Sequence, residues 1–280
     1  MNSNSSALVS IIIPCYNHGE FIINTLESLS KCDEKLHELI IINDGSTDEY
    51  TLKVFVELEQ KGYRIIHQQN AGLSAARNTG ILVAKGKYIL PLDADNKIRP
   101  EFLIEGIQAM ENDNEVVVVY GDAEYFGEKI GIWKVGEYNL QRLMLANYID
   151  ACAMIRKSVF DQVGLYDTNL KLGLEDWEFW LRLSFRGCKF VYVPKILFDY
   201  RVIKTSMSKE LLKNYKKRNK TEEQIEQKFQ NKLSKPVVTN FIIKRFKNGP
   251  IKFIIKLILA SYFPNKYEKL LKDNKIVRGL

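Results

Sequence analysis

The chain has 280 residues, of which 46% are hydrophobic and 27% charged, a composition typical of a soluble globular protein and not of a disordered or fibrous one. Its longest apolar stretch, residues 251–263, is too short to span a bilayer and contains two lysines. The net charge of +7 is uneven: residues 1–203 carry 21 Lys and Arg against 28 Asp and Glu, whereas residues 204–280 carry 20 against 6, which predicts an anionic partner for the basic part.

The first part of the chain alternates strand-like and helix-like segments. β-Branched runs predict strands, and apolar residues three or four apart predict helices. In chain order we expect a strand at 8–13, a helix at 19–30, a strand at 38–43, a helix ending near 62, a strand at 63–68, a helix at 72–85 and a strand at 87–92. This alternation predicts an α/β fold with a mostly parallel central sheet flanked by helices. Right-handed crossovers would place the carboxyl ends of these strands on one rim.

The later segments are shorter. They read as a helix at 100–112, a strand at 115–120, extended pieces within 121–138, a helix at 140–146, a strand at 150–156, a helix at 175–186, and strands at 189–193 and 197–202. From residue 204 the composition changes to a polar helical stretch and then a basic, apolar one. We therefore predict a globular domain at 1–203 and a basic, largely helical C-terminal extension at 204–280.

The predicted strand at 87–92 runs directly into two carboxylates, Asp93 and Asp95. On an extended backbone, side chains two residues apart point the same way, so these acids would repel each other unless a cation lay between them. Divalent cations such as Mg²⁺ prefer oxygen ligands. The segment therefore predicts a metal site, and a polar turn that holds two aspartates by chance is the alternative.

Further polar residues follow the other predicted strands. They are Pro14, Tyr16 and Asn17 after the first strand, Asp44 after the second, and Asn70, Gly72 and Arg77 after the third. In open α/β sheets, ligands bind outside the carboxyl ends of the strands. An arginine beside a metal-binding acid pair suits a diphosphate, and Asp44 could accept hydrogen bonds from a base or ribose. The structural alternatives are a turn-forming Asp44 and a surface Arg77.

A second acid cluster opens the predicted helix at 175–186 and consists of Glu175, Asp176 and Glu178, with Trp177 and Trp180 beside them. Acids at a helix start are stabilised by the macrodipole, so a structural role is one interpretation. Apolar walls, however, raise the basicity of a carboxylate. If this segment folds over the rim, one of these acids could remove a proton from an acceptor hydroxyl.

Several other classes of protein are excluded by missing motifs. No phosphate-binding Gly-x-x-x-x-Gly-Lys-Ser/Thr loop occurs, and no Gly-x-Gly-x-x-Gly follows the first strand. All three histidines precede residue 68, which rules out a serine hydrolase with its His after the Ser of segment 72–76. The four cysteines show no metal spacing, which predicts reduced thiols in a cytosolic protein, and we expect no signal peptide.

Five segments together resemble family 2 glycosyltransferases of the GT-A fold. They are Val9-Ser-Ile-Ile-Ile-Pro14-Cys-Tyr16-Asn17, Ile42-Asn-Asp44-Gly-Ser-Thr-Asp48, Asn70-Ala-Gly72-Leu-Ser-Ala-Ala-Arg77-Asn78-Thr-Gly80, Leu92-Asp93-Ala-Asp95 and Glu175-Asp176-Trp177-Glu178. The resemblance covers roughly residues 8–202 and implies that residues 1–203 form the catalytic domain. It implies an inverting transfer of a hexosyl or N-acetylhexosaminyl group from a nucleotide-diphosphate sugar, with Mn²⁺ or Mg²⁺.

The resemblance also implies roles for single residues. Asp44 would hold the nucleobase, Arg77 the uridine or diphosphate side, Asp93 the ribose or metal and Asp95 the metal. Asp176 would be the general base and Glu175 the next candidate, while Pro14, Tyr16, Asn17 and Asn70 would line the donor site. Many relatives carry a His shortly after a Tyr-Arg pair, where this chain offers Lys204, which could still pair with diphosphate.

The basic, apolar stretch at 237–263 predicts either binding to an anionic membrane surface or packing on the catalytic domain. We expect a cytoplasmic enzyme, peripheral on the inner face of the plasma membrane, that uses a glycan or lipid-linked acceptor in surface polysaccharide synthesis and binds no nucleic acid. The alternatives are a nucleotidyltransferase, which would need a Gly-rich, Arg-bearing loop after the first strand, and a polyanion- or membrane-binding protein on an inactive transferase scaffold.

Overall fold

The computed structural model describes residues 7–203, 215–230 and 232. Two compact units are distinguished, one formed by residues 1–138 and 149–221, the other by residues 139–148 and 222–280. Lys204 and the basic stretch at 237–263 lie outside the described residues. The predicted division into 1–203 and 204–280 therefore stays a prediction. No helix in the described ranges is long and apolar enough to cross a membrane.

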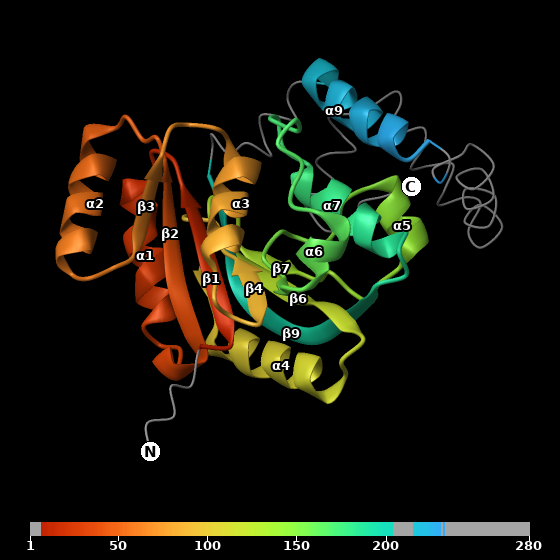
Figure 1. Ribbon diagram of the computed structural model, residues 1–280, viewed down its shortest axis with the longest axis horizontal. Helices are drawn as coiled ribbons and strands as arrows, with labels where there is room; N and C mark the ends of the chain where they lie inside the picture. Colours follow the sequence, from red (N-terminus) through yellow and green to blue (C-terminus); the bar gives the residue numbers. More distant parts are fainter. Residues whose placement is uncertain (1–6, 204–214, 231, 233–280) are drawn as a thin grey trace. The chain divides into compact units, whose positions relative to one another are not determined.

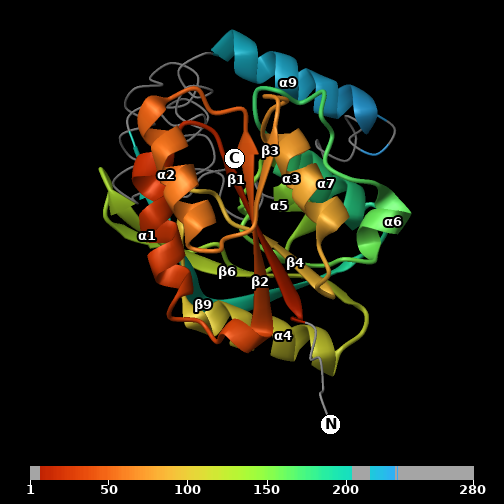
Figure 2. The ribbon, with the colours of Figure 1, turned by 60° about the vertical axis from the view of Figure 1, so that its left-hand side comes forward.

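The first half of the sheet is entirely parallel. Its strands, in spatial order, are β3 (Ile65–Gln68), β2 (His37–Asp44), β1 (Val9–Cys15) and β4 (Tyr88–Pro91). The connecting segments contain α1 (Gly19–Leu29), the short 3-10 helix η1 (Glu34–Leu36), α2 (Glu49–Gln60) and α3 (Leu73–Val83). Figures 1 and 2 show α1 and α2 side by side on one face of these strands and α3 on the other. All seven residues of β1 are buried, as expected for a strand covered on both faces.

The second half of the sheet is mixed. From β4 the order continues through β8 (Met154–Arg156), β6 (Val116–Gly127), β9 (Lys189–Val202) and β5 (Lys97–Ile98), with β7 (Gly131–Trp133) on β6. Of these pairings only that of β6 with β9 is parallel. The helices that follow β5 are α4 (Pro100–Asn112), α5 (Leu140–Leu145), α6 (Val159–Val163), α7 (Glu175–Ser184) and α9 (Tyr215–Lys228).

The predicted α/β class is confirmed, and the differences lie in the later strands. Where we expected two short strands, β9 is continuous, because a bulge absorbs Pro194 and Lys195: Val193 pairs with Gly121, and Ile196 pairs with the next residue, Asp122. Strand β6 likewise continues to Gly127 instead of ending near residue 120. The two-residue β5 and five-residue α6 were not predicted, because such short elements carry no readable period.

Candidate active site

The carboxyl ends of β1, β2 and β4 lie on one rim, because these strands are parallel. Tyr16 follows β1 and is exposed there. Pro14 was expected to end this strand, but β1 continues to Cys15 and Pro14 is a buried strand residue paired with Ile42. Tyr16 is therefore the first residue after β1 that lies at the rim.

Asn17 joins the loops that follow β1 and β2. Its backbone is left-handed, with φ of 54°. Its Oδ1 accepts hydrogen bonds from the backbone N–H groups of Thr47 (2.8 Å) and Asp48 (3.0 Å), and its own N–H donates to Ser46 Oγ at 3.1 Å. Asn17 therefore holds the loop after β1 and the loop after β2 in fixed positions relative to each other.

Asp44 holds the loop that leads into α3. One carboxylate oxygen accepts from Gln68 Nε2 (2.7 Å) and Ala71 N (2.9 Å), and the other accepts from Gly72 N at 2.9 Å. Asn70 is exposed in this loop. The turn-forming role considered from the sequence is therefore present, and the buried carboxylate keeps lone pairs to offer a ligand.

Asp93 and Asp95 lie on a turn, so the expectation that they sit on an extended backbone is wrong. Strand β4 ends at Pro91, and the N–H of Asn96 donates to Asp93 O at 3.0 Å. The Thr25 hydroxyl of α1 fixes this turn by donating to Ala94 O at 2.8 Å. The two carboxylates nevertheless remain close: burial first and the charge of Asp93 second raise the pKa of Asp95 to about 7.

Arg77 is buried between the two acid clusters, which excludes the surface position considered from the sequence. It is 1% exposed. Its Nη2 donates to Asp93 Oδ1 at 2.7 Å, its Nη1 donates to Glu175 Oε1, and its guanidinium lies 5.7 Å from the centre of the Tyr166 ring. Burial opposes its charge, but Asp93 and Glu175 raise the pKa of Arg77 well above its usual range. Arg77 thus ties the start of α7 to the turn after β4.

Asp176, beside Glu175, has a raised pKa because it is desolvated and because the charges of Glu175 and Asp150 lie near. Its Oδ1 accepts from the backbone N–H of Trp177 at 2.8 Å. Trp177 and Trp180 are both buried on α7, and the expectation that they wall the site stays a prediction. The two acid clusters, far apart in sequence, therefore form one site.

Two residues of this site were missed in the sequence. Burial and the charge of Asp93 raise the pKa of Asp150 to about 7, and Asp150 precedes β8 with no motif around it. Arg201, on β9, donates from Nε to Asp95 O at 2.9 Å, and its backbone N–H donates to Asn96 Oδ1 at 2.9 Å. The Tyr200-Arg201 pair was noted only as the marker before Lys204, and it was the one available signal.

The charges in this site favour a divalent cation. Five carboxylates, those of Asp93, Asp95, Asp150, Glu175 and Asp176, interact with Arg77 or with one another. In the described ranges, no three acidic, His or Cys side chains are arranged as a complete metal site. The oxygen donors of Asp93 and Asp95, with the raised pKa of Asp95, nevertheless fit an ion completed by ligand oxygens.

Removing Arg77 is expected to destabilise the protein strongly, because it would leave Asp93 and Glu175 without their buried partner. We expect Arg77→Leu to lower the free energy of unfolding by about 3–5 kcal/mol. Urea denaturation followed by circular dichroism measures this. Arg64→Leu is the control: Arg64 is an exposed partner of Glu38 (3.4 Å), and its loss should cost less than about 1 kcal/mol. Equal losses in the two variants would contradict a bridging role for Arg77.

The raised pKa of Asp150 predicts a pH dependence of stability. Its folded pKa of about 7 exceeds the ordinary value, so the folded protein binds the proton more tightly and loses stability as pH rises toward 7. His18 and His37, with lowered pKa, act in the opposite direction. The test is therefore a difference: relative to wild type, metal-free Asp150→Asn should gain melting temperature as pH rises from about 4 to about 7, and the gain should level off above pH 7. A constant difference would contradict the assignment.

Comparison with solved structures agrees with this fold. TarS of S. aureus in complex with UDP-GlcNAc superposes with a TM-score of 0.58 and 19% identity, covering 71% of this chain and 60% of that one. The mannosyltransferase PcManGT from Pyrobaculum calidifontis, in complex with GDP-Man and Mn²⁺, has a TM-score of 0.61 and 16% identity, covering 95% and 84%. The fold is that of the GT-A glycosyltransferases, which defines the fold class of this protein.

Sequence comparison narrows the class to one family. Residues 10–164, more than half of the chain, match the model of "Glycosyl transferase family 2". The uncharacterized glycosyltransferase YibD of Escherichia coli is 38% identical over 130 residues, which are 46% of this chain and 37% of that protein. RP339 of Rickettsia prowazekii is 30% identical over 210 residues, covering 71% and 63%. The chain belongs to glycosyltransferase family 2, and it spans less than two thirds of the length of both relatives.

Proposed function

We propose that the protein transfers a sugar, with inversion, from a nucleotide-diphosphate donor to an acceptor hydroxyl. The observation that carries this proposal is the buried Arg77 bridge, which ties the acid turn at Asp93 to the helix that begins with Glu175 and Asp176. The bridge supports a site at the carboxyl ends of the strands in which Asp93 and Asp95 bind the donor and Asp176 is the base. This is the arrangement that a single displacement at an anomeric carbon requires.

In this proposal the donor lies along the rim. Asp44 binds the base, Tyr16 and Asn70 border the nucleotide, and Asn17 and Pro14 shape the first loop. Asp93 contacts the ribose or the metal, and Asp95 coordinates the metal. Arg77, whose amino groups are committed to Asp93 and Glu175, acts by holding these acids and by its positive charge near the diphosphate. Lys204 is proposed to pair with the diphosphate.

Asp176 is the proposed general base, in preference to Glu175. Glu175 is 5% exposed and bonded to Arg77, so its carboxylate is already occupied. The raised pKa of Asp176 makes it a better proton acceptor from a hydroxyl. The acceptor oxygen bonds to the anomeric carbon as the bond to the diphosphate oxygen breaks, and the hydroxyl proton passes to Asp176. A bound Mn²⁺ or Mg²⁺ would supply charge neutralisation for the leaving diphosphate.

The donor class is supported by the solved relatives of this fold, which hold UDP-GlcNAc in TarS and GDP-Man in PcManGT. We propose a hexosyl or N-acetylhexosaminyl donor and a glycan or lipid-linked acceptor of a surface polysaccharide. The test is a panel of UDP- and GDP-sugars with Mn²⁺ or Mg²⁺, scored for released nucleoside diphosphate and, where release is slow, for binding. We expect metal-dependent binding of one donor, and absence of binding by every donor would overturn the proposal.

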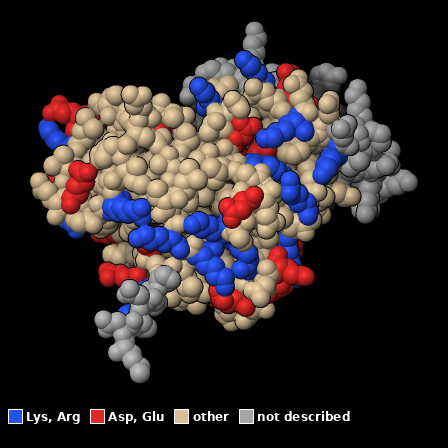
Figure 3. Space-filling view, viewed as in Figure 1, with Lys and Arg blue, Asp and Glu red and all other residues tan. Residues whose placement is uncertain are grey.

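The alternative of a polyanion-binding protein is less well supported by the face of the molecule that Figure 3 shows. Figure 3 shows basic side chains gathered in a band over the region of β1, β4 and α4, but acidic side chains lie among them. Lysines at the starts of β4 and β9 pair with acids at the end of α4, Lys87 with Glu111 (2.8 Å) and Lys189 with Asp113 (2.6 Å). Such mixed charge does not form the single-signed surface that binds nucleic acid.

We propose that residues 237–263 attach the enzyme to the inner, anionic face of the membrane, where a lipid-linked acceptor would lie. Removing residues 237–280 is expected to abolish binding to vesicles with a third of anionic lipid while leaving donor binding intact. Vesicle sedimentation at low and high salt measures this. Binding that is equal for the full chain and the shortened chain would refute membrane attachment and leave packing on the catalytic domain.

A further inference from the structure

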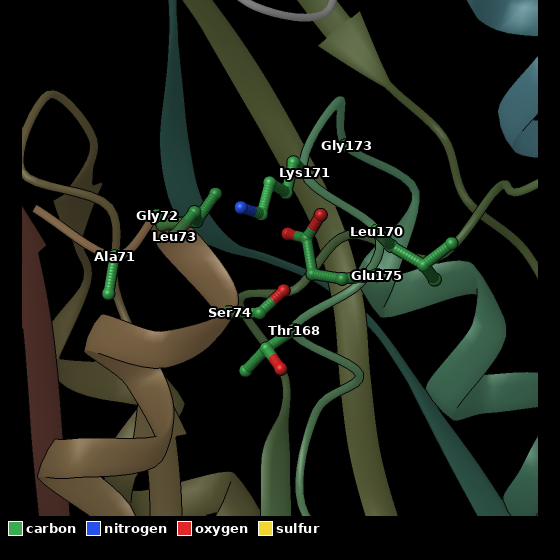
Figure 4. A pocket seen from close by; sticks show the side chains of 9 residues that line it. All are labelled: Ala71, Gly72, Leu73, Ser74, Thr168, Leu170, Lys171, Gly173 and Glu175. Carbon is green, nitrogen blue, oxygen red and sulfur yellow. The ribbon is translucent and has the colours of Figure 1, made fainter.

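A small pocket lies at the start of α3, beside the acids of the active site. Figure 4 shows its walls, formed on one side by the first residues of α3 and on the other by the segment before α7. The space is about 10 Å³, room for one water-sized group. Its lining residues with polar side chains are Ser74, Thr168, Lys171 and Glu175. A single oxygen atom fits this space, whereas a sugar ring does not.

Helix α3 presents unsatisfied donors to this pocket. It is eleven residues long, begins after Gly72 (φ 93°) and has no side-chain cap. Gly72 N donates to Asp44, but among the described residues the N–H groups of Leu73, Ser74 and Ala75 have no acceptor. Unpaired N–H groups and the positive end of the macrodipole favour a negatively charged oxygen at this position.

Ser74 provides a second, independent observation. It is 5% exposed, and its Oγ has no hydrogen-bond partner in the described part of the chain. Figure 4 shows this hydroxyl pointing into the pocket. A buried hydroxyl without a partner is unfavourable unless a ligand or water completes it. The hydroxyl of Ser74 can therefore donate a hydrogen bond to a ligand atom in the pocket.

The remaining charges in the pocket are compatible with an anion. Figure 4 shows the amino group of Lys171 pointing across the pocket toward Gly72 and Leu73. Lys171 makes no hydrogen bond or ion pair within the described ranges. The carboxylate of Glu175 also lines the pocket, but it is paired with Arg77. The amino group of Lys171 and the N–H groups at the start of α3 are thus available to bind a negatively charged group.

We propose that this pocket binds an anionic oxygen of the substrate, from a carboxylate or phosphate group on either the donor sugar or the acceptor. The site consists of the first N–H groups of α3, Ser74 Oγ and Lys171 Nζ. Because Glu175 lines the pocket and Asp176 is the next residue of α7, a substrate held here lies near the start of the helix that carries the proposed base. The inference rests on the proposed transferase function and extends it to a negatively charged substrate class.

The experiment compares matched neutral and anionic probes by calorimetric titration with Mn²⁺ present. The donor pairs are UDP-glucose with UDP-glucuronic acid and GDP-mannose with GDP-mannuronic acid. The acceptor pair, tested with the bare nucleotide bound, is methyl glucoside with its 6-phosphate. Wild type, Ser74→Ala and Lys171→Ala are compared with Lys31→Ala, which removes an exposed lysine near the end of α1.

We expect the anionic member of one pair to bind about tenfold more tightly to wild type and to Lys31→Ala. This preference should fall to near unity in Lys171→Ala and decrease severalfold in Ser74→Ala. The pair that shows it identifies the donor or the acceptor as the source of the anion. No preference in any pair, or a preference that both variants retain, would overturn the proposal. Binding of the neutral sugars in that case would leave the proposed transferase function standing.

Discussion

Asp95→Ala is expected to lower sugar transfer by about a hundredfold to a thousandfold, the scale of losing one electrostatic stabiliser of developing negative charge. Asp95 lies on the turn after β4, and Arg201 fixes that turn by donating to the Asp95 carbonyl at 2.9 Å. The main chain therefore holds its position when the side chain is removed. The carboxylate is desolvated and close to Asp93, which raise its pKa to about 7 and agree with the proposal that it binds a cation.

Two measurements separate this outcome from misfolding. The melting temperature of metal-free Asp95→Ala should equal or exceed that of wild type, because a buried repulsion is removed. Titration with Mn²⁺ should show loss of tight binding in the presence of nucleoside diphosphate. Asp161→Ala on α6, which removes an exposed acid outside the site, is the matched control and should retain both. Unchanged Mn²⁺ affinity in Asp95→Ala would move the metal site elsewhere.

The sequence predicted the parts of this site that are carried by contiguous motifs. Asp44 and the pair Asp93 and Asp95 were selected because they lie within three residues after apolar runs. The ends of these parallel strands are brought to one rim by topology alone. The backbone at Asp93 was predicted incorrectly, because whether a strand continues or turns after Pro91 depends on tertiary contacts such as Thr25 with Ala94. The local sequence pattern predicts which residues lie at the rim, but it does not predict how their side chains are oriented.

The missed features all depend on contacts between distant segments. Arg77 and Glu175 form a hydrogen bond although they are 98 residues apart in the sequence, and neither motif indicates that they pair. Asp150 lies before the three-residue strand β8, and no sequence motif surrounds it. It is brought near Asp93 by the pairing of β8 with β4, which the sequence does not indicate. Pro194 interrupts the strand pattern in the sequence, whereas the bulge that tolerates it exists only once β6 is alongside.

The second large effect concerns the choice between two adjacent acids. Asp176→Asn is expected to lower kcat by about a hundredfold to ten-thousandfold, the contribution of a general base. The substitution keeps the size of the side chain and the acceptor for the Trp177 N–H (2.8 Å) but removes the basic oxygen. Donor affinity should change little, and the melting temperature should not fall, because the substitution removes a buried acid whose pKa is raised. In wild type, kcat should rise with pH as Asp176, whose pKa is raised, loses its proton. The residual activity of Asp176→Asn should not show this rise.

Glu175→Gln is the matched comparison, because the two acids are adjacent at the start of the same helix. Glu175 is ion-paired with the buried Arg77, so its neutral analogue weakens the bridge that positions α7. We expect a lower melting temperature and a smaller loss of kcat, with the pH dependence retained. If Glu175→Gln instead abolished turnover at an unchanged melting temperature while Asp176→Asn remained active, Glu175 would be the base. The Arg77 bridge would then have to open during each turnover, because a carboxylate held by a guanidinium is a poor proton acceptor.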